Sequence, residues 1–319
     1  MQDVKADNLE LFFDCLDESN NLLYEKVHKP YFELLEMTVQ NILAGEILTD
    51  LDEEDTQALQ KIYDKIADVD FSVEDVRKAM QAIVLRGFKE MRIPNGNTTP
   101  DTLGIFIAYL ITKLCPEKEI SIADPLCGTG NLILTVSNHL DKMCHLYACD
   151  NDLWMTKLTK MTADLLSAPI EVFLQDTLQL NLSGMNACIF DMPHSGLDEQ
   201  TKEYFPYTAV LSYIPMLRPD GCMIGIVEND FFNYDKNKRF KEELLKEMTI
   251  IGLVELPDSM FVSTKPKIIL VLQKRVMKDK KCFMVKLPSF TNVKEFNNAL
   301  IDIEAWFENN NYNKRSEEN

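Results

Sequence analysis

The chain has 319 residues, of which 46% are hydrophobic and 26% are charged, a balance typical of a globular protein with a substantial core. Its formal net charge of −18 excludes the globally basic surface that many nucleic-acid-binding proteins carry. No apolar run reaches the roughly 18 residues needed to span a bilayer, and the acidic, amphipathic first residues predict neither a signal peptide nor a transit peptide.

The negative charge is concentrated near the N-terminus. Residues 1–95 hold 10 Lys and Arg against 21 Asp and Glu, a balance of −11, whereas the remaining residues hold 23 against 30, a balance of −7. An acidic surface on the first third of the chain is therefore a candidate site for a protein partner.

Cysteine usage indicates the compartment. The eight cysteines occur singly, with no Cys-x-x-Cys pair and no histidine cluster beside them. This pattern predicts reduced thiols, a cytoplasmic location and no structural metal site.

Residues 1–91 are predicted to be helical. A second helix begins after Pro30, acids fill the first turn of a third in TDLDEEDTQALQKIYDKI, and Ser72 with Asp75 has capping-box spacing at the start of a fourth. The first helix has an apolar stripe with i, i+3, i+4, i+7 spacing: Leu9, Phe12, Phe13 and Leu16. The segment RIPNGNTTP (92–100) is the predicted linker, which divides the chain into a helical domain, 1–94, and a second domain, 95–319.

Strands and helices alternate after the linker. A helix is predicted over 101–114, and further helices at NLILTVSNHL, DLWMTKLTKMTADLL and KRFKEELLKEM. The predicted strands are EISIADP, HLYACD, IEVFLQD, ACIFD, CMIGIVEN, IIGLVEL and KIILVLQK. This alternation predicts an α/β fold with a parallel, doubly wound sheet.

The segment ADPLCGTGNLIL ends a strand at Asp124 and turns through Gly128 and Gly130 into a helix. Glycine lets a backbone approach a ligand closely and adopt positive φ. A dinucleotide-binding turn needs a third glycine three residues further on, where this chain has Ile133. S-adenosylmethionine, which has no pyrophosphate, is the alternative ligand.

The motif DPLCGTGNLI resembles the Asp-Pro-x-Cys-Gly-Thr-Gly signature of N6-adenine DNA methyltransferases. Asp150 at the end of HLYACD is similar in position to the acid that binds the ribose hydroxyls in that family, and Asp176 in VFLQDTL to the acid near the cofactor adenine. The resemblance implies S-adenosylmethionine as cofactor, held by Thr99, Pro100, Asp124, Pro125, Cys127, Gly128, Thr129, Gly130, Asp150 and Asp176.

The order of these motifs also matches the family. The helical N-terminus and the segment LVELPDSMFVSTKPKIILVLQK further resemble a compact Gram-positive subgroup. The resemblance implies a Rossmann-like class I methyltransferase sheet, of strand order 3-2-1-4-5-7-6, with an all-α N-terminal domain.

The fourth predicted strand ends in an altered catalytic motif. The family has Asn-Pro-Pro-Tyr or Phe here: the Asn side chain and the next carbonyl accept hydrogen bonds from the target amino group, and the aromatic ring stacks on the flipped base. This chain has Asp191-Met192-Pro193-His194. Asp191 can still accept a hydrogen bond from the target amino group. The proline keeps the backbone of Met192 extended, and the His194 ring can stack on the base. The resemblance implies that these four residues are catalytic.

Two functions remain open. The first is an S-adenosylmethionine-dependent N-methyltransferase that modifies an amino group, adenine N6 in DNA or RNA. The second is a catalytically altered or inactive cofactor-binding scaffold that acts through its acidic N-terminal helices. Two features argue against DNA as the substrate. The net charge is negative, and the short interval after Pro193 leaves no room for a target-recognition domain.

Local features could still bind nucleic acid. The segment KEYFPY offers Tyr204, Phe205 and Tyr207, either as stacking groups or as core residues. The segment NYDKNKRFK is basic, and eight more basic residues occur in 265–286: Lys265, Lys267, Lys274, Arg275, Lys278, Lys280, Lys281 and Lys286. Lysines that protect an edge strand are the alternative explanation of that run.

Overall fold

The N-terminal part of the chain is helical, as predicted. The computed structural model describes residues 3–93, 98–198, 200, 203–261, 264–277 and 281–310. Up to residue 93 it contains α1 (Asp3–Val27), α2 (Tyr31–Ala44), α3 (Glu53–Asp64) and α4 (Val73–Met91). Ser72 and Asp75 form both bonds of the predicted capping box at the start of α4. The middle of the predicted linker, 94–97, lies outside the described residues.

The described residues after the linker build an eight-stranded sheet of order β3-β2-β1-β4-β5-β7-β6-β8. The first seven positions confirm the class I order, and β8 adds an eighth strand beside β6. The strands are β1 (Glu119–Asp124), β2 (Met143–Asp150), β3 (Ile170–Leu174), β4 (Met185–Asp191), β5 (Leu217–Glu228), β6 (Thr249–Glu255), β7 (Lys267–Gln273) and β8 (Phe283–Lys286).

One strand departs from the parallel arrangement that the alternation of strands and helices predicts. β7 pairs antiparallel with both β5 and β6. The segment between β6 and β7 contains only the short helix η5 (Asp258–Met260) in its described part. A parallel crossover needs about a dozen residues or more, usually including a helix. The chain therefore turns back on itself, which brings the start of β7 to the carboxyl ends of β4 and β5.

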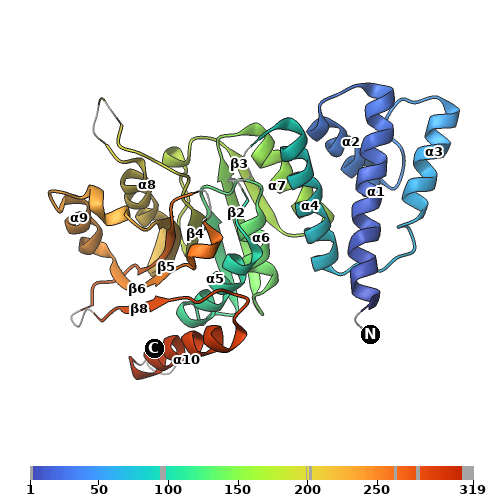
Figure 1. The fold of residues 1–319 in the computed structure, drawn as a ribbon. Helices are drawn as coiled ribbons and strands as arrows, with labels where there is room; N and C mark the ends of the chain where they lie inside the picture. Colours follow the sequence, from blue (N-terminus) through green and yellow to red (C-terminus); the bar gives the residue numbers. More distant parts are fainter. Residues whose placement is uncertain are drawn as a thin grey trace.

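Helices cover both faces of the sheet (Figure 1). The alternation of side chains along β4 separates the two cores: Ala187 and Ile189 pack with α5 and α6, whereas Cys188 and Phe190 pack with α8 and α9. The helices are α5 (Asp101–Leu114), α6 (Asn131–Asn138), α7 (Leu153–Leu165), α8 (Phe205–Tyr213), α9 (Arg239–Glu247) and α10 (Val293–Asn309). None of the helices in the described residues is long and apolar enough to cross a membrane.

The N-terminal helices pack against α7 at one end of the molecule (Figure 1). Phe12, Phe32 and Phe88 share a hydrophobic cluster with Met155 and Leu158 of α7. The two parts of the chain are therefore joined by a continuous core rather than by the linker alone.

Candidate active site

A cavity of about 440 Å³ lies at the carboxyl ends of β1, β2 and β4, the edge where ligands bind in open α/β sheets. Eight predicted site residues line it: Thr99, Pro125, Cys127, Gly128, Asp150, Asp176, Asp191 and Pro193. Six others are described but do not line it: Pro100, Asp124, Thr129, Gly130, Met192 and His194. The lining also includes residues that the sequence interpretation missed: Leu126, Leu132, Asn151, Asp152, Met155, Thr177 and Phe205.

Several of the missed residues carried a signal in the sequence. Asn151 and Asp152 directly follow Asp150, and Asp152 caps α7 by accepting hydrogen bonds from the backbone of Trp154 and Met155. The aromatic residues at the start of α8 have different surroundings. Phe205 lines the cavity, whereas Tyr204 is buried and stacks on Tyr234, with ring centroids 4.1 Å apart. Tyr207 is likewise a packing residue, stacked on Phe240 at 4.0 Å.

The turn after β1 uses its two glycines differently. Both have positive φ, 52° at Gly128 and 77° at Gly130. The backbone N–H of Gly128 donates to Asp150 Oδ2 at 2.9 Å, at the wall of the cavity. A Cβ on Gly130 would meet Thr159 Cγ2 at 2.7 Å. Gly130 is therefore required by the close packing of α7 on the turn, whereas Gly128 lies where a ligand can approach.

Carboxyl groups surround the cavity. Burial raises the pKa of Asp150 above its ordinary value, while hydrogen bonds from backbone N–H groups lower it. Burial also raises the pKa of Asp124 well above its ordinary value, and the charges of Asp150 and Asp191 add to the effect. Asp124 Oδ1 accepts from the N–H of Leu126, but its Oδ2 is buried with no hydrogen-bond partner in the described part of the chain. Such a group is costly to bury unless a donor reaches it.

Asp191 ends β4 with both carboxylate oxygens engaged. Thr99 Oγ1 donates to Oδ2 at 3.0 Å, and Lys267 Nζ, from the first residue of β7, lies 2.5 Å from Oδ1. The same ammonium donates to the carbonyl oxygen of Met192 at 3.0 Å. The side chain of Asp191 and the next backbone carbonyl thus converge on a single amine.

His194 is turned toward a second ionic cluster. Its Nδ1 contacts Glu228 Oε1, although the ring itself is 73% exposed. Glu228 is buried, and Lys265 Nζ donates to its Oε2 at 3.1 Å and to Asp230 Oδ2 at 3.1 Å. Lys265 and Lys267 therefore both pair with acids, and β7 lies between β5 and β6 in the sheet, which argues against both a free basic patch and edge protection at these two positions. Lys278 and Lys280 of that run lie outside the described residues.

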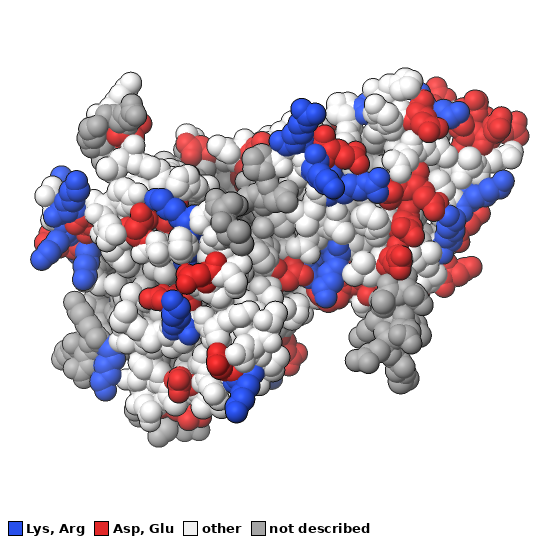
Figure 2. Space-filling model, in the orientation of Figure 1, with Lys and Arg blue, Asp and Glu red and all other residues white. Residues whose placement is uncertain are grey.

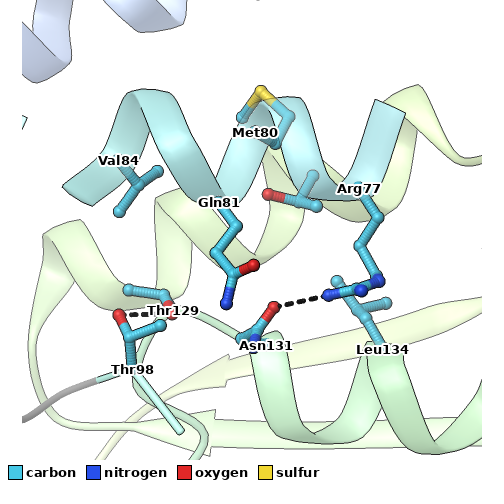
Figure 3. A pocket seen from close by; sticks show the side chains of 9 residues that line it. Arg77, Met80, Gln81, Val84, Thr98, Thr129, Asn131 and Leu134 are labelled. Atoms are coloured by element: carbon cyan, nitrogen blue, oxygen red, sulfur yellow. Dashed lines mark hydrogen bonds between the residues drawn. The ribbon is translucent and has the colours of Figure 1, made fainter. Parts of the chain in front are cut away.

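A buried arginine connects the N-terminal helices to this site (Figure 3). Arg77 of α4 is 1% exposed and donates from Nη1 to Asn131 Oδ1 at 2.9 Å. Its guanidinium also binds Asp101 and Glu74. Asn131 in turn donates from Nδ2 to the carbonyl of Thr99 at 2.7 Å. A chain of hydrogen bonds therefore runs from α4 through Asn131 to Thr99, whose side chain donates to Asp191.

Comparisons with known proteins identify the family. Residues 10–88 match the YtxK N-terminal helical domain, and residues 95–319 match the N-6 DNA Methylase family. The second match covers more than half of the chain. The chain belongs to the N-6 DNA methylase family.

Similar proteins extend over most of the chain. The uncharacterized protein YtxK of Bacillus subtilis is 29% identical, over 95% of this chain and 99% of its own length. A crystal structure from Listeria monocytogenes, described as a class I S-adenosylmethionine-dependent methyltransferase, is 28% identical with a TM-score of 0.84 and covers 94% of this chain and 99% of its own. The type I restriction-modification methyltransferase subunit of Streptococcus thermophilus shares the fold at 13% identity, with a TM-score of 0.62 over 95% of this chain and 79% of its own.

Membership of this family settles the class of chemistry. The chain is an S-adenosylmethionine-dependent methyltransferase, and S-adenosylmethionine is its cofactor. The residues around the cavity fit that cofactor. Gly128 lines the cavity with a backbone at positive φ, and the carboxyl groups suit a sulfonium and an ammonium. The buried Oδ2 of Asp124 lacks a hydrogen-bond donor among the described residues, which an ammonium could supply.

Proposed function

We propose that this protein methylates an amino group, and that its substrate is the N6 amino group of adenine in nucleic acid. One observation carries the proposal: Asp191 Oδ1 and the carbonyl of Met192 hold one amine between them, at 2.5 and 3.0 Å. A target amino group has two hydrogens to donate to such a pair. The family match and the likeness to restriction-modification methyltransferase subunits support nucleic acid as the substrate.

The cofactor would be held by the lining residues of the cavity. Asp150 is assigned to the two ribose hydroxyls, Asp176 to the region of the adenine, and the backbone around Gly128 to the methionine end. Thr99, which lines the cavity, and Pro100 beside it would help to hold the same end. S-adenosylmethionine supplies a methyl group activated by a positively charged sulfur, and the acidic cavity favours that charge.

Asp191 and Met192 would orient the target nitrogen. When both hydrogens of the amine are donated to these acceptors, its lone pair points away from them and is free to form the new N–C bond. The nitrogen would accept the methyl group as that group leaves the sulfur of S-adenosylmethionine, and its excess proton would pass to solvent. Asp191 would act only as a hydrogen-bond acceptor, a role that the asparagine of the family motif shares.

The nucleic acid would have to be bound locally, because the overall charge is repulsive. Exposed basic residues cluster before and at the start of α9: Lys236, Lys238, Arg239 and Lys241. Figure 2 shows basic side chains at this end of the molecule, whereas acidic side chains gather over the N-terminal helices at the other end. His194, on the exposed side of the motif, would stack on the base.

The domain division and the location also remain proposals. We assign residues 1–94 to the helical domain and 95–319 to the methyltransferase domain. A cytoplasmic location is supported by the eight cysteines, all free thiols.

One observation favours the second candidate, a scaffold without catalysis. Both proposed amine acceptors are already bound by Lys267. In that case the chain would keep the methyltransferase fold and the cofactor without catalysing transfer, and its acidic N-terminal helices would bind a protein partner.

Transfer of labelled methyl groups separates the two functions. We expect wild-type protein to incorporate label from S-adenosylmethionine into unmethylated genomic DNA or RNA. Asp191→Ala should lower the rate about 30- to 1000-fold, since one positioned hydrogen-bond acceptor contributes roughly 2–4 kcal/mol in the transition state. It should change cofactor affinity little. Equal incorporation by both proteins would contradict the role of Asp191.

A further inference from the structure

We propose that Lys267 is a built-in occupant of the amine site, which keeps the site closed to a neutral target amine until the lysine side chain moves out. This inference rests on the proposed function, because it takes Asp191 and Met192 as the acceptors of the target. Lys267 Nζ lies 2.5 Å from Asp191 Oδ1 and 3.0 Å from Met192 O. It therefore uses the two hydrogen bonds that the target amine would need.

The position of Lys267 follows from the fold. β7 runs antiparallel to β5, so its first residue pairs with Glu228 at the end of β5, next to the end of β4. Lys267 and Asp191 are both largely buried, with side chains 20% and 17% exposed. In such a site a carboxylate needs a compensating charge, and a flexible lysine can provide it and also swing away.

Charge makes Lys267 a strong competitor. The Lys267 ammonium and the Asp191 carboxylate attract each other as opposite charges, whereas a neutral amine is attracted to the carboxylate through its hydrogen bond alone. An incoming adenine amino group would therefore have to replace an ion pair with a contact in which only the acceptor is charged. Asp191, which stands in place of the family asparagine, and Lys267 together form a pair with no net charge. Replacing Asp191 alone would therefore leave the ammonium of Lys267 in the site.

Three variants test this arrangement against wild type. Lys267→Met removes the ammonium but retains an unbranched side chain, and Asp191→Asn with Lys267→Met also removes the carboxylate charge left behind. Lys265→Met is the matched control: it makes the same change of charge two residues away, where the lysine binds Glu228 and Asp230 rather than Asp191. The probe is a short single-stranded oligodeoxynucleotide with one adenine, titrated in the presence of saturating S-adenosylhomocysteine, and compared with the same oligonucleotide carrying purine in place of adenine.

We expect Lys267→Met and the double variant to bind the adenine probe at least tenfold more tightly than wild type and to lose most of that gain with the purine probe. Lys265→Met should stay within about twofold of wild type. Cofactor affinity, measured by calorimetry, should be unchanged in all variants, which also reports that they are folded.

Binding and transfer distinguish the two proposals. Unchanged adenine affinity in folded Lys267→Met, or an equal gain in Lys265→Met, would overturn the role of Lys267 even if wild type transfers methyl groups. Tighter adenine binding without methyl transfer by any variant would support the occupied site and overturn the proposed reaction. Faster methyl transfer by the double variant than by Asp191→Asn alone would support both the role of Lys267 and the proposed reaction.

Discussion

Asp124 is a fully buried carboxyl group whose Oδ2 has no hydrogen-bond partner among the described residues. Burial raises the pKa of Asp124 well above its ordinary value. The folded protein therefore binds the proton of this carboxyl group more tightly than the unfolded chain does. Stability should therefore fall as the pH rises from about the ordinary value of 3.8 toward the raised one. In the cofactor-free protein the buried Asp124 carboxyl group therefore lowers the free energy of unfolding, and a ligand ammonium would offset this loss.

Asp124→Asn should consequently have opposite effects on stability and on binding. At neutral pH we expect the cofactor-free variant to melt a few degrees higher than wild type, since each kcal/mol shifts the melting temperature of a domain of this size by about 2–4 °C. Its affinity for S-adenosylmethionine should fall, because a ligand ammonium would favour the ionised form of Asp124, a form that an amide cannot adopt. Calorimetric melting between pH 5 and 8 and isothermal titration measure both effects. A lower melting temperature together with undiminished affinity would contradict this role for Asp124.

The turn after β1 shows how far single residues could be interpreted from the sequence. DPLCGTG and Asp150 lie together at one cavity because each follows a strand whose end is fixed by the sheet order. Lys267 was not predicted as a partner of Asp191, because 76 positions separate the two and only the reversal of β7 brings them together. A basic run in the sequence gives no sign of which lysines face an internal acid.

Among the elements, the helices and strands with strong periodicity were predicted well. The range 101–114 coincides with α5, and the capping box at Ser72 begins α4. α8, β8 and α10 were missed. α8 begins with an aromatic and proline-containing segment without helical periodicity, and the four residues of β8, FMVK, begin with three consecutive apolar residues rather than alternating.

Helix α4 connects the N-terminal helices to the candidate cofactor site through Arg77. Its five N–H donors are all used, by Glu74, Asp101 and Asn131. The hydrogen bonds and charge of Arg77 lower the pKa of Glu74 to about 2, against partial burial, so this contribution to stability is present above the ordinary carboxyl pKa of about 4.5 and is lost as the pH falls from there toward 2.

Arg77→Met should weaken cofactor binding as well as folding. Removing one partner of a buried ionic network typically costs about 3–5 kcal/mol of stability. Asn131 would also lose the partner that orients it toward Thr99, and the segment at the cavity would become less well placed. We expect a lower melting temperature and, at a temperature where the variant is folded, a lower affinity for S-adenosylmethionine. Arg77→Lys should recover part of both losses.

Phe88→Leu on the same helix is the control. Phe88 is buried against Phe32, with ring centroids 5.6 Å apart, and forms none of the polar contacts of Arg77. This variant should lose stability without losing cofactor affinity in the folded state. If both variants lower affinity in proportion to their stability, Arg77 is structural only and does not position the site.

At the scale of the whole molecule, the helical domain and the methyltransferase domain form one continuous unit. The hydrophobic cluster around α7 and the network of Arg77 both cross the proposed domain boundary. The acidic side chains over the N-terminal helices lie at the opposite end of the molecule from the basic residues near α9 (Figure 2). A nucleic-acid substrate would therefore be oriented by this asymmetry, with its backbone toward α9, and should bind less tightly as the salt concentration rises.

The central claim is that this protein methylates the N6 amino group of adenine in nucleic acid. Its most direct test is nucleoside analysis by mass spectrometry after unmethylated DNA and RNA are incubated with the protein and S-adenosylmethionine carrying a deuterated methyl group. We predict deuterated N6-methyladenine nucleoside from wild type and more of it from the Asp191→Asn and Lys267→Met double variant. Absence of that nucleoside with both proteins, while calorimetry shows that each binds S-adenosylmethionine, would contradict the claim.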